Sequence, residues 1–184
     1  MTLDDRIEPT DGETVFDGQT FVVRVERFRR PDGEIVEREI VSRQDAAAIV
    51  AYDDEHVWLV SQPREAIRRQ MLEIPAGKLD VEGESPLRTA RRELAEEIGQ
   101  EAERWEAVIS YVASSGYSDE LVHIFAATDL RSSAVEPDPQ ELIEVVRWPL
   151  NDLDGAIAES RDAKTVIGLQ WLQLRLLSQQ GGGS

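Results

Sequence analysis

The sequence has no cysteine, and only two of its 184 residues are histidine. Without cysteine, the chain has neither a disulfide framework nor thiolate chemistry. It also lacks any run of about 18 apolar residues, so no membrane-spanning helix is expected. Its first residues, MTLDDRIEPTDG, lack the basic and apolar regions of a secretory signal. Together these absences favour a cytoplasmic protein.

Basic residues are also scarce. The chain has 20 lysines and arginines against 37 aspartates and glutamates, which gives a formal net charge of −17. This balance argues against general nucleic-acid binding, because such affinity comes largely from lysine and arginine contacts with phosphates. An anionic substrate would need local help, either from a metal ion or from a few placed arginines.

The residues that are present suit one globular domain. The chain is 41% hydrophobic and 31% charged, and 184 residues suffice to bury a sizeable core. We expect a polar N-terminal arm over residues 1–14 and a single domain over residues 15–178. Residues 179–184 end in Gly-Gly-Gly-Ser and resemble a linker tail.

Alternation of apolar and polar residues predicts several strands. Segments 19–27 and 34–42 flank a Pro-Asp-Gly turn, so an N-terminal antiparallel hairpin is expected over about residues 19–42. Further strand-like segments cover residues 46–52, 56–62, 105–112, 121–127 and 142–148. Helical patterns cover residues 153–159 and 163–177. No strand–helix–strand alternation is evident, which favours a mixed α+β domain with helices packed on a mixed, curved sheet.

The stretch from Gly77 to Gly99 contains the clearest helix signal. Pro86 suits the first turn, Ser85 is a candidate N-cap, and Gly99 is placed to end the helix. An apolar stripe at helical spacing would face the core, and it consists of Leu87, Ala90, Leu94 and Ile98.

Three carboxylates, on Glu93, Glu96 and Glu97, project from the other side of this helix within one turn. Like charges at this spacing destabilise a helix by roughly 0.2–0.5 kcal/mol per pair, and the C-terminal end of the macrodipole also disfavours anions. Arg92 can reach Glu96 and relieve part of the repulsion. A hard divalent cation such as Mg²⁺, which prefers oxygen ligands, would relieve the rest. The alternative interpretation is a solvated charged face.

These residues resemble the signature of the Nudix hydrolases, G-x5-E-x7-R-E-U-x-E-E-x-G-U, in which U is apolar. The matching positions are Gly77, Glu84, Arg92, Glu93, Leu94, Glu96, Glu97 and Gly99. Two positions depart from it. Six residues separate Gly77 from Glu84, and Gln100 stands where an apolar residue is usual. The extra residue lies in the loop, so the helix spacing is kept. The resemblance implies a Nudix-type α/β/α sandwich.

Sequence outside this signature resembles the ADP-ribose pyrophosphatase branch of the family. The matching segments are LEIPAGKLD at 72–80, SGYSDE at 115–120 and DAKT at 162–165. Pro63 replaces a usual aromatic residue, Ser115 a usual proline, and Arg43 and Asp45 replace common histidine and glycine. This branch implies Mg²⁺-dependent hydrolysis of ADP-ribose or a related nucleoside diphosphate sugar, with Mn²⁺ as an alternative metal, by a homodimer.

The resemblance also implies roles for the residues of the signature. Glu93 and Glu97 would be the main metal ligands, with Glu96 close by and the Ala76 carbonyl as a further ligand. Arg92 would hold the glutamates by charge-assisted hydrogen bonds. Glu84 would support them, or would instead stabilise the helix N-terminus.

Residues outside the signature would bind substrate and activate water. Glu141, before the strand at 142–148, is the positional match for the loop carboxylate that takes the proton from water, and Glu120 and Glu144 compete for this role. Arg64 is a candidate diphosphate contact, and Glu73 a candidate ribose or base contact. Residues predicted to contact the nucleotide, some across the dimer, are Arg27, Phe28 and Glu120. His56 and His123 are expected to be ordinary strand residues.

Two alternatives remain open at this point. The chain could act on another nucleoside diphosphate derivative, such as GDP-mannose, NADH or a diadenosine polyphosphate. It could also be a non-catalytic Nudix module that senses a nucleotide. Three mutually repelling acids argue against the second alternative, because a sensor has no need of them.

Overall fold

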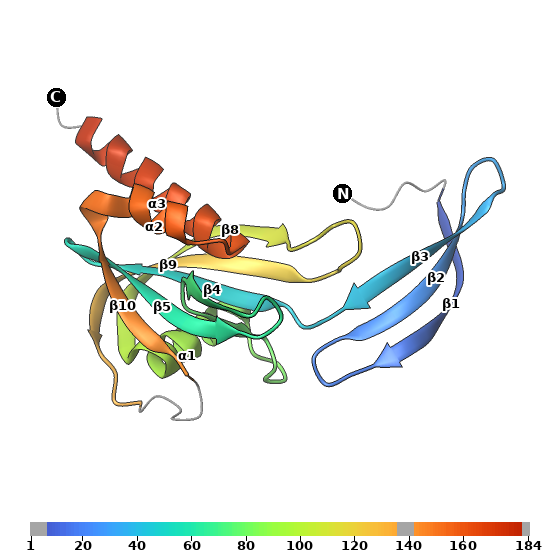
Figure 1. The fold of residues 1–184 in the computed structure, drawn as a ribbon, viewed down its shortest axis with the longest axis horizontal. Helices are drawn as coiled ribbons and strands as arrows, with labels where there is room; N and C mark the ends of the chain where they lie inside the picture. Colours follow the sequence, from blue (N-terminus) through green and yellow to red (C-terminus); the bar gives the residue numbers. More distant parts are fainter. Residues whose placement is uncertain (1–6, 136–141, 182–184) are drawn as a thin grey trace. The chain divides into compact units, whose positions relative to one another are not determined.

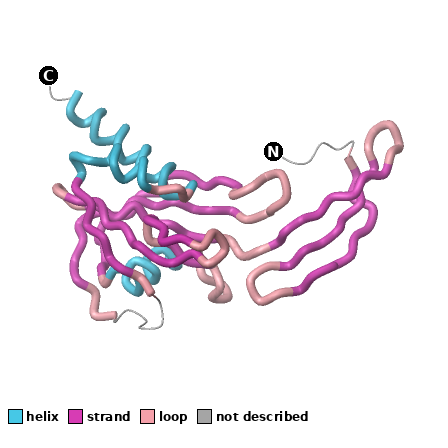
Figure 2. The backbone as a smooth tube through the Cα atoms, viewed as in Figure 1, coloured by secondary structure: helices cyan, strands magenta, loops and turns pink. Residues whose placement is uncertain are grey.

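The computed structural model describes residues 7–135 and 142–181, which form two compact units (Figure 1). The first unit comprises the chain up to Asp45 together with Tyr111–Leu121. The second comprises Ala46–Ser110 together with the chain from Val122 onward. Within the described residues the first unit contains strands and loops, whereas the helices belong to the second (Figure 2).

An antiparallel sheet forms most of the first unit. Its strands are β1 (Glu8–Asp17), β2 (Val22–Arg29) and β3 (Ile35–Ser42), in the order β1-β2-β3. The β2–β3 hairpin confirms the sequence prediction, and Gly33 at its turn has a positive φ of 88°, which favours glycine. Strand β1 differs from the expected polar arm, because its exposed residues pair with β2 through the backbone.

A larger mixed sheet forms the centre of the second unit. Its strands run in the order β10-β5-β4-β9-β8, β6 pairs with β5, and β7 pairs with β4. These strands are β4 (Ala46–Tyr52), β5 (His56–Arg64), β6 (Arg69–Glu73), β7 (Ala76–Lys78), β8 (Gln100–Val112), β9 (Leu121–Ser132) and β10 (Glu144–Pro149). The β4–β9 pair is parallel, whereas β4 pairs with β5 and β7 in the antiparallel sense.

Helices cover both faces of this sheet. Figure 1 shows α1 (Pro86–Ile98) on one side, and α2 (Leu153–Glu159) and α3 (Ala163–Gly181) on the other. A short 3₁₀ turn, Leu150–Asp152, leads into α2. The expected α/β/α sandwich with a mixed sheet is therefore confirmed. None of the described helices is long and apolar enough to cross a membrane.

The central strand β4 joins the two layers of the core. Ala47, Ile49 and Ala51 pack in a fully buried cluster with Leu94 of α1. On the α3 side, Gly168 lies so close to the sheet that an added Cβ would come within 2.7 Å of Val50. Helices α1 and α3 thus pack on the strand with which β5 and β7 pair.

Candidate active site

Helix α1 begins and ends where the sequence predicts. Ser85 is its N-cap and accepts a hydrogen bond from the Arg88 backbone N–H at 3.4 Å, and Pro86 occupies the first turn. Gly99 closes the helix in the left-handed conformation, with φ 64° and ψ 29°. These caps fix the register of α1, so its apolar stripe meets the sheet and its acids face away from that stripe.

The acidic side of α1 is not a solvated surface. Glu93 is 9% exposed and Glu97 is 6% exposed. The Glu97 carboxylate accepts a hydrogen bond from the Ala76 backbone N–H at 2.9 Å. The interpretation as a solvated charged face is therefore wrong for these two residues, although Glu96 is partly exposed.

Arg92 lies at the centre of the acid cluster. Its Nη1 donates to Glu93 at 2.6 Å and to Glu96 at 3.0 Å. Its Nε and Nη2 each lie 3.3 Å from the Glu84 carboxylate. Partial burial lowers the pKa of Arg92, but the charges of Glu93 and Glu96 and the hydrogen bonds to Glu96 and Glu84 outweigh it, so the pKa is raised. Arg92 therefore stays charged and offsets the repulsion among the acids.

The loop before α1 is tied to the helix at two points. Glu84 accepts a hydrogen bond from the hydroxyl of the fully buried Thr89 at 3.0 Å. Gly77 lies directly against Glu93, where an added Cβ would overlap the Glu93 carboxylate. Between these points the loop turns through Gly83, which has a φ of 76°. The loop therefore includes its extra residue while Glu84 still reaches Arg92.

These groups line a cleft of about 490 Å³ within the second unit. One wall carries the acids and Arg92 of α1 together with the start of β7. The opposite wall carries Gln62, Pro63 and Arg64 from the end of β5, and Leu142 and Ile143 complete the lining. The structure thus brings together these predicted site residues in one cleft: Arg64, Ala76, Arg92, Glu93, Glu96 and Glu97.

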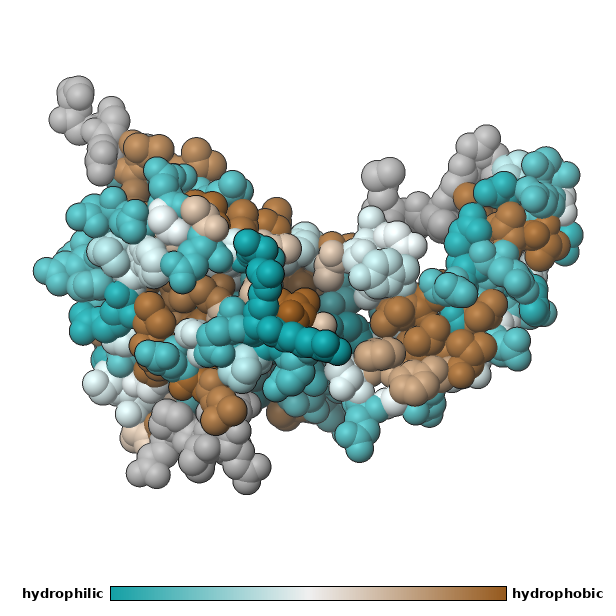
Figure 3. Space-filling view, viewed as in Figure 1, coloured by the Kyte–Doolittle hydropathy of each residue, from teal (hydrophilic) through white to brown (hydrophobic). Residues whose placement is uncertain are grey.

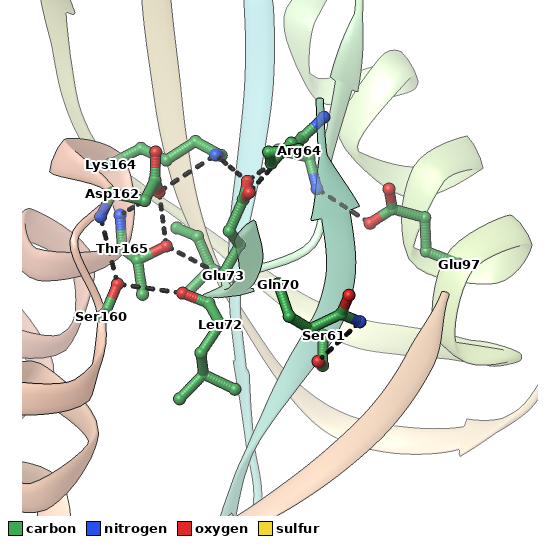
Figure 4. Close-up of polar contacts among 12 residues, drawn as sticks. Ser61, Arg64, Gln70, Leu72, Glu73, Glu97, Ser160, Asp162, Lys164 and Thr165 are labelled. Carbon is green, nitrogen blue, oxygen red and sulfur yellow. Dashed lines mark hydrogen bonds and ion pairs between the residues drawn. The ribbon is translucent and has the colours of Figure 1, made fainter. Parts of the chain in front are cut away.

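Glu73 occupies a different environment from the one expected of a ligand contact. It is 2% exposed, and its two carboxylate oxygens accept hydrogen bonds from Arg64 Nε at 2.6 Å and Nη2 at 2.8 Å. Lys164 Nζ donates to the same carboxylate (Figure 4). Burial raises the pKa of Glu73, but the hydrogen bonds and charges of Arg64 and Lys164 outweigh it, so the pKa is lowered.

Other predicted residues lie elsewhere in the chain. Arg27 and Phe28 belong to β2 of the first unit, where Arg27 pairs with Glu37 at 2.8 Å and with Asp11 at 3.3 Å. Glu120 belongs to the same unit and lies 3.5 Å from Arg43. Glu141 lies outside the described residues, while its chain neighbour Leu142 lines the cleft.

Sequence reasoning gave no role to Lys164. The DAKT run marked its position, but its partner Glu73 lies 91 residues away. Asp80, which lies 3.4 Å from Arg92, was likewise not predicted. Its position in the loop between Gly77 and α1 could have indicated a contact with Arg92.

The cleft offers oxygen donors that suit a hard divalent cation. Glu93 and Glu97 are buried carboxylates on one wall, and such a cation prefers ligands of this kind. Over residues 7–135 and 142–181, no three histidine, aspartate or glutamate side chains converge as a ready-made metal site. In this structure Glu93 and Glu96 bind Arg92, and Glu97 accepts the Ala76 N–H.

Comparison with known proteins identifies this arrangement. Residues 42–167 match the NUDIX domain. The chain belongs to the NUDIX family. It is 39% identical over 169 residues to an ADP-ribose pyrophosphatase of Bacillus subtilis (strain 168), which covers 89% of this chain and 90% of that protein. It is 38% identical over 168 residues to a methanol dehydrogenase activator of Bacillus methanolicus, with the same coverage of 89% and 90%.

The NUDIX fold is also found in a solved structure. The crystal structure of an ADP compounds hydrolase superposes with a TM-score of 0.86 over 97% of this chain and 98% of that chain, at 24% sequence identity. The predictions of the NUDIX family, its fold and a NUDIX pyrophosphohydrolase are therefore confirmed.

Proposed function

We propose that this chain cleaves the pyrophosphate bond of ADP-ribose, or of a related nucleoside diphosphate sugar, to give a nucleoside monophosphate and a sugar phosphate. One observation carries the proposal: the acids of α1 and the cation Arg64 face the same cleft. Such a cleft can hold a metal ion beside a diphosphate. The names of two relatives, an ADP-ribose pyrophosphatase and an ADP compounds hydrolase, support the substrate class.

Glu93 and Glu97 would hold Mg²⁺, or Mn²⁺ as the alternative, with Glu96 and the Ala76 carbonyl as further ligands. When bound, the metal polarises a phosphoryl oxygen and neutralises developing charge. Arg92 keeps Glu93 and Glu96 in place through its hydrogen bonds, and the Ala76 N–H holds Glu97. Arg64 contacts the diphosphate. The predicted nucleotide contacts outside the cleft are Arg27, Phe28 and Glu120, whereas the buried Glu73, also predicted as a contact, binds Arg64 instead.

Glu141 would take the proton from the attacking water. The next residue in the sequence, Leu142, lines the cleft, which supports this role. The competing carboxylates are Glu120 and Glu144. Glu141→Gln, Glu120→Gln and Glu144→Gln should be compared at saturating metal. The assignment requires the largest loss of kcat in Glu141→Gln, and a larger loss in either other variant would move the role to that residue.

A substrate panel tests the proposal as a whole. Purified protein with Mg²⁺ should release AMP from ADP-ribose, and Glu97→Gln should abolish most of this release. The matched control is Glu82→Gln, an exposed acid of the loop before α1, which should keep it. The panel also includes ADP-sugars, GDP-mannose, NADH and diadenosine polyphosphates. If the wild type leaves ADP-ribose and the ADP-sugars intact and cleaves GDP-mannose, NADH or a diadenosine polyphosphate, the substrate assignment changes to that compound. Calorimetric binding without turnover would favour a nucleotide-sensing module.

We also propose a cytoplasmic homodimer. Support comes from the sheet of the first unit, in which none of the residues of β1, β2 and β3 is buried. Figure 3 shows apolar side chains gathered on this unit, and its exposed large residues include Val15, Phe16, Phe21 and Ile35. Light scattering should give twice the chain mass of 20.7 kDa. A mass of 20.7 kDa would refute the dimer.

A further inference from the structure

Arg64 lies between two carboxylates, those of Glu73 and Glu97, which attract its guanidinium in different directions. On one side its guanidinium binds the buried Glu73 through Nε and Nη2. On the other side lies Glu97 of α1, whose negative charge also contributes to the raised pKa of Arg64 (Figure 4). Both carboxylates attract the same cation. The direction in which Arg64 points therefore depends on which of them holds it more firmly.

The contact of Arg64 with Glu73 is made through hydrogen bonds. Two parallel N–H···O bonds of 2.6 and 2.8 Å fix the plane of the guanidinium as well as its position. Because Nε and Nη2 are occupied, Nη1 is the part of the fork left for the cleft. The Arg64 side chain is 42% exposed, while that of Glu73 is 3% exposed. Glu73 is thus anchored inside the protein and presents Arg64 at the cleft wall.

Glu73 is in turn held by Lys164, at the start of α3. Lys164 Nζ binds the Glu73 carboxylate and lies 3.0 Å from Asp162. The backbone around it is fixed, because Thr165 Oγ1 accepts the Ile74 N–H at 2.9 Å and Ser160 Oγ donates to the Leu72 carbonyl at 2.9 Å (Figure 4). The start of α3 is therefore hydrogen-bonded to Leu72 and Ile74, the residues on either side of Glu73.

We propose that Lys164 and Glu73 are positioning residues that aim Arg64 at the substrate diphosphate and keep it away from the acids of α1. Lys164 neutralises Glu73 in a buried site, where an unpaired charge is costly. Without Glu73, Arg64 would turn to Glu97, where it would compete with a cation for that carboxylate. Without Lys164, the unneutralised Glu73 would hold Arg64 more firmly and draw its charge away from the diphosphate. The proposal rests on the proposed function of the cleft.

Kinetics of Lys164→Met test the aiming of Arg64. This variant should raise the KM for ADP-ribose about tenfold, a typical loss for a supporting partner, with kcat changed much less. Lys164→Arg, which keeps the charge, should recover most of the KM. Arg175→Met removes another paired cation from α3, bound to Glu106 at 2.8 Å, and should leave the KM unchanged. An unchanged KM in Lys164→Met would overturn the proposal.

A double variant separates positioning from a general structural role. If Lys164 acts through Arg64, then adding Lys164→Met to Arg64→Met should raise the KM no further. A KM increase of equal factor in both backgrounds would show that Lys164 acts independently, and would refute the proposal. If the wild type binds ADP-ribose without cleaving it, the enzymatic function fails, and the same comparison is made with the calorimetric Kd.

Metal binding without nucleotide gives a second readout, which does not depend on turnover. Titration with Mn²⁺ should show weaker binding in Glu73→Gln, because the released Arg64 would compete for Glu97. The double variant Glu73→Gln, Arg64→Met should recover the affinity. Equal Mn²⁺ affinity in the wild type and Glu73→Gln would overturn this part of the proposal. Absence of Mn²⁺ binding in the wild type would instead refute the proposed metal site, and with it the competition for Glu97.

Discussion

At the scale of single residues, Gly77 shows how tightly the candidate site is packed. The need for glycine there comes from close approach, since the Glu93 carboxylate occupies the space that a Cβ would take. Gly83 in the same loop differs: its φ of 76° favours glycine, but no atom lies within 4 Å of an added Cβ. Within one loop, glycine is therefore needed at Gly77 for lack of space and favoured at Gly83 by the backbone conformation.

Gly77→Ala should therefore displace Glu93 and reduce both activity and Mn²⁺ affinity. Overpacking of this kind costs about 1–3 kcal/mol of the free energy of unfolding. Urea denaturation and calorimetry measure the two effects. Gly83→Ala is the matched control, and it should lose about 1 kcal/mol to backbone strain while keeping Mn²⁺ affinity. Equal Mn²⁺ affinity in Gly77→Ala and the wild type would contradict the overlap with Glu93.

Glu73 should make stability depend on acid pH. Its pKa in the folded protein is lower than its ordinary value of 4.5, despite burial, because of Arg64 and Lys164. A depressed pKa stabilises the fold above the unfolded value, and this stabilisation is lost as the pH falls through the folded value. Glu73 binds Arg64 and Lys164, and Lys164 also lies 3.0 Å from Asp162.

Glu73→Gln should accordingly be less stable than the wild type at neutral pH, and the difference should shrink as the pH falls below about 4.5. The free energy of unfolding of both proteins, measured by urea across this range, checks the sign. A difference that is independent of pH would show that Glu73 carries no titration-linked stability. Glu82→Gln, at an exposed position, supplies the reference profile.

At the scale of elements, the sequence predicts the ends of α1 well, because residues next to the helix in the chain determine them. The cap, the first-turn proline and the terminal glycine of α1 lie next to the helix in sequence, and its predicted bounds are confirmed. Strands β1 and β6 are not among the predicted strands, and most of β1 falls in the expected polar arm. Each pairs with the strand next to it in the chain: β6 pairs with β5, and the exposed β1 pairs with β2. Periodicity does not reveal them, because β1 is exposed throughout and β6 has only five residues, with its buried residues consecutive rather than alternating.

The same limit applies to the candidate site. Sequence spacing identified Arg92 and its glutamates because they share one helix. The link between Lys164 and Glu73 depends on how α3 docks on the sheet, over a separation of 91 residues. No local pattern encodes this contact.

Leu94 tests the docking of α1 on the sheet. It is fully buried against Ile49 and its neighbours, so Leu94→Ala should cost about 2–5 kcal/mol of the free energy of unfolding. Leu174 of α3 is 68% exposed, and Leu174→Ala should change stability by about 0.5 kcal/mol or less. Urea midpoints give both values. Similar losses in the two variants would contradict the assignment of Leu94 to the core.

At the scale of the whole molecule, net charge dominates the electrostatics. A formal charge of −17 opposes compaction through self-repulsion. Added salt screens it, because the Debye length falls from roughly 30 Å at about 0.01 M to roughly 3 Å at about 1 M. The Tm should therefore rise with NaCl over this range, and KCl should give the same curve. A falling Tm would show that attractive ion pairs outweigh the repulsion.

The parallel pairing of β4 with β9 has a consequence for the nascent chain. Strand β4 is synthesised early, yet its parallel neighbour arrives only with residues 122–127. Until then the ribosome has released β5, β7 and the whole of α1, while one edge of the most buried strand stays unpaired. Pairing across such a separation is slow, and open strand edges invite aggregation. The acids of α1 therefore emerge before the sheet beneath them is complete, and net negative charge of this kind opposes association between such chains.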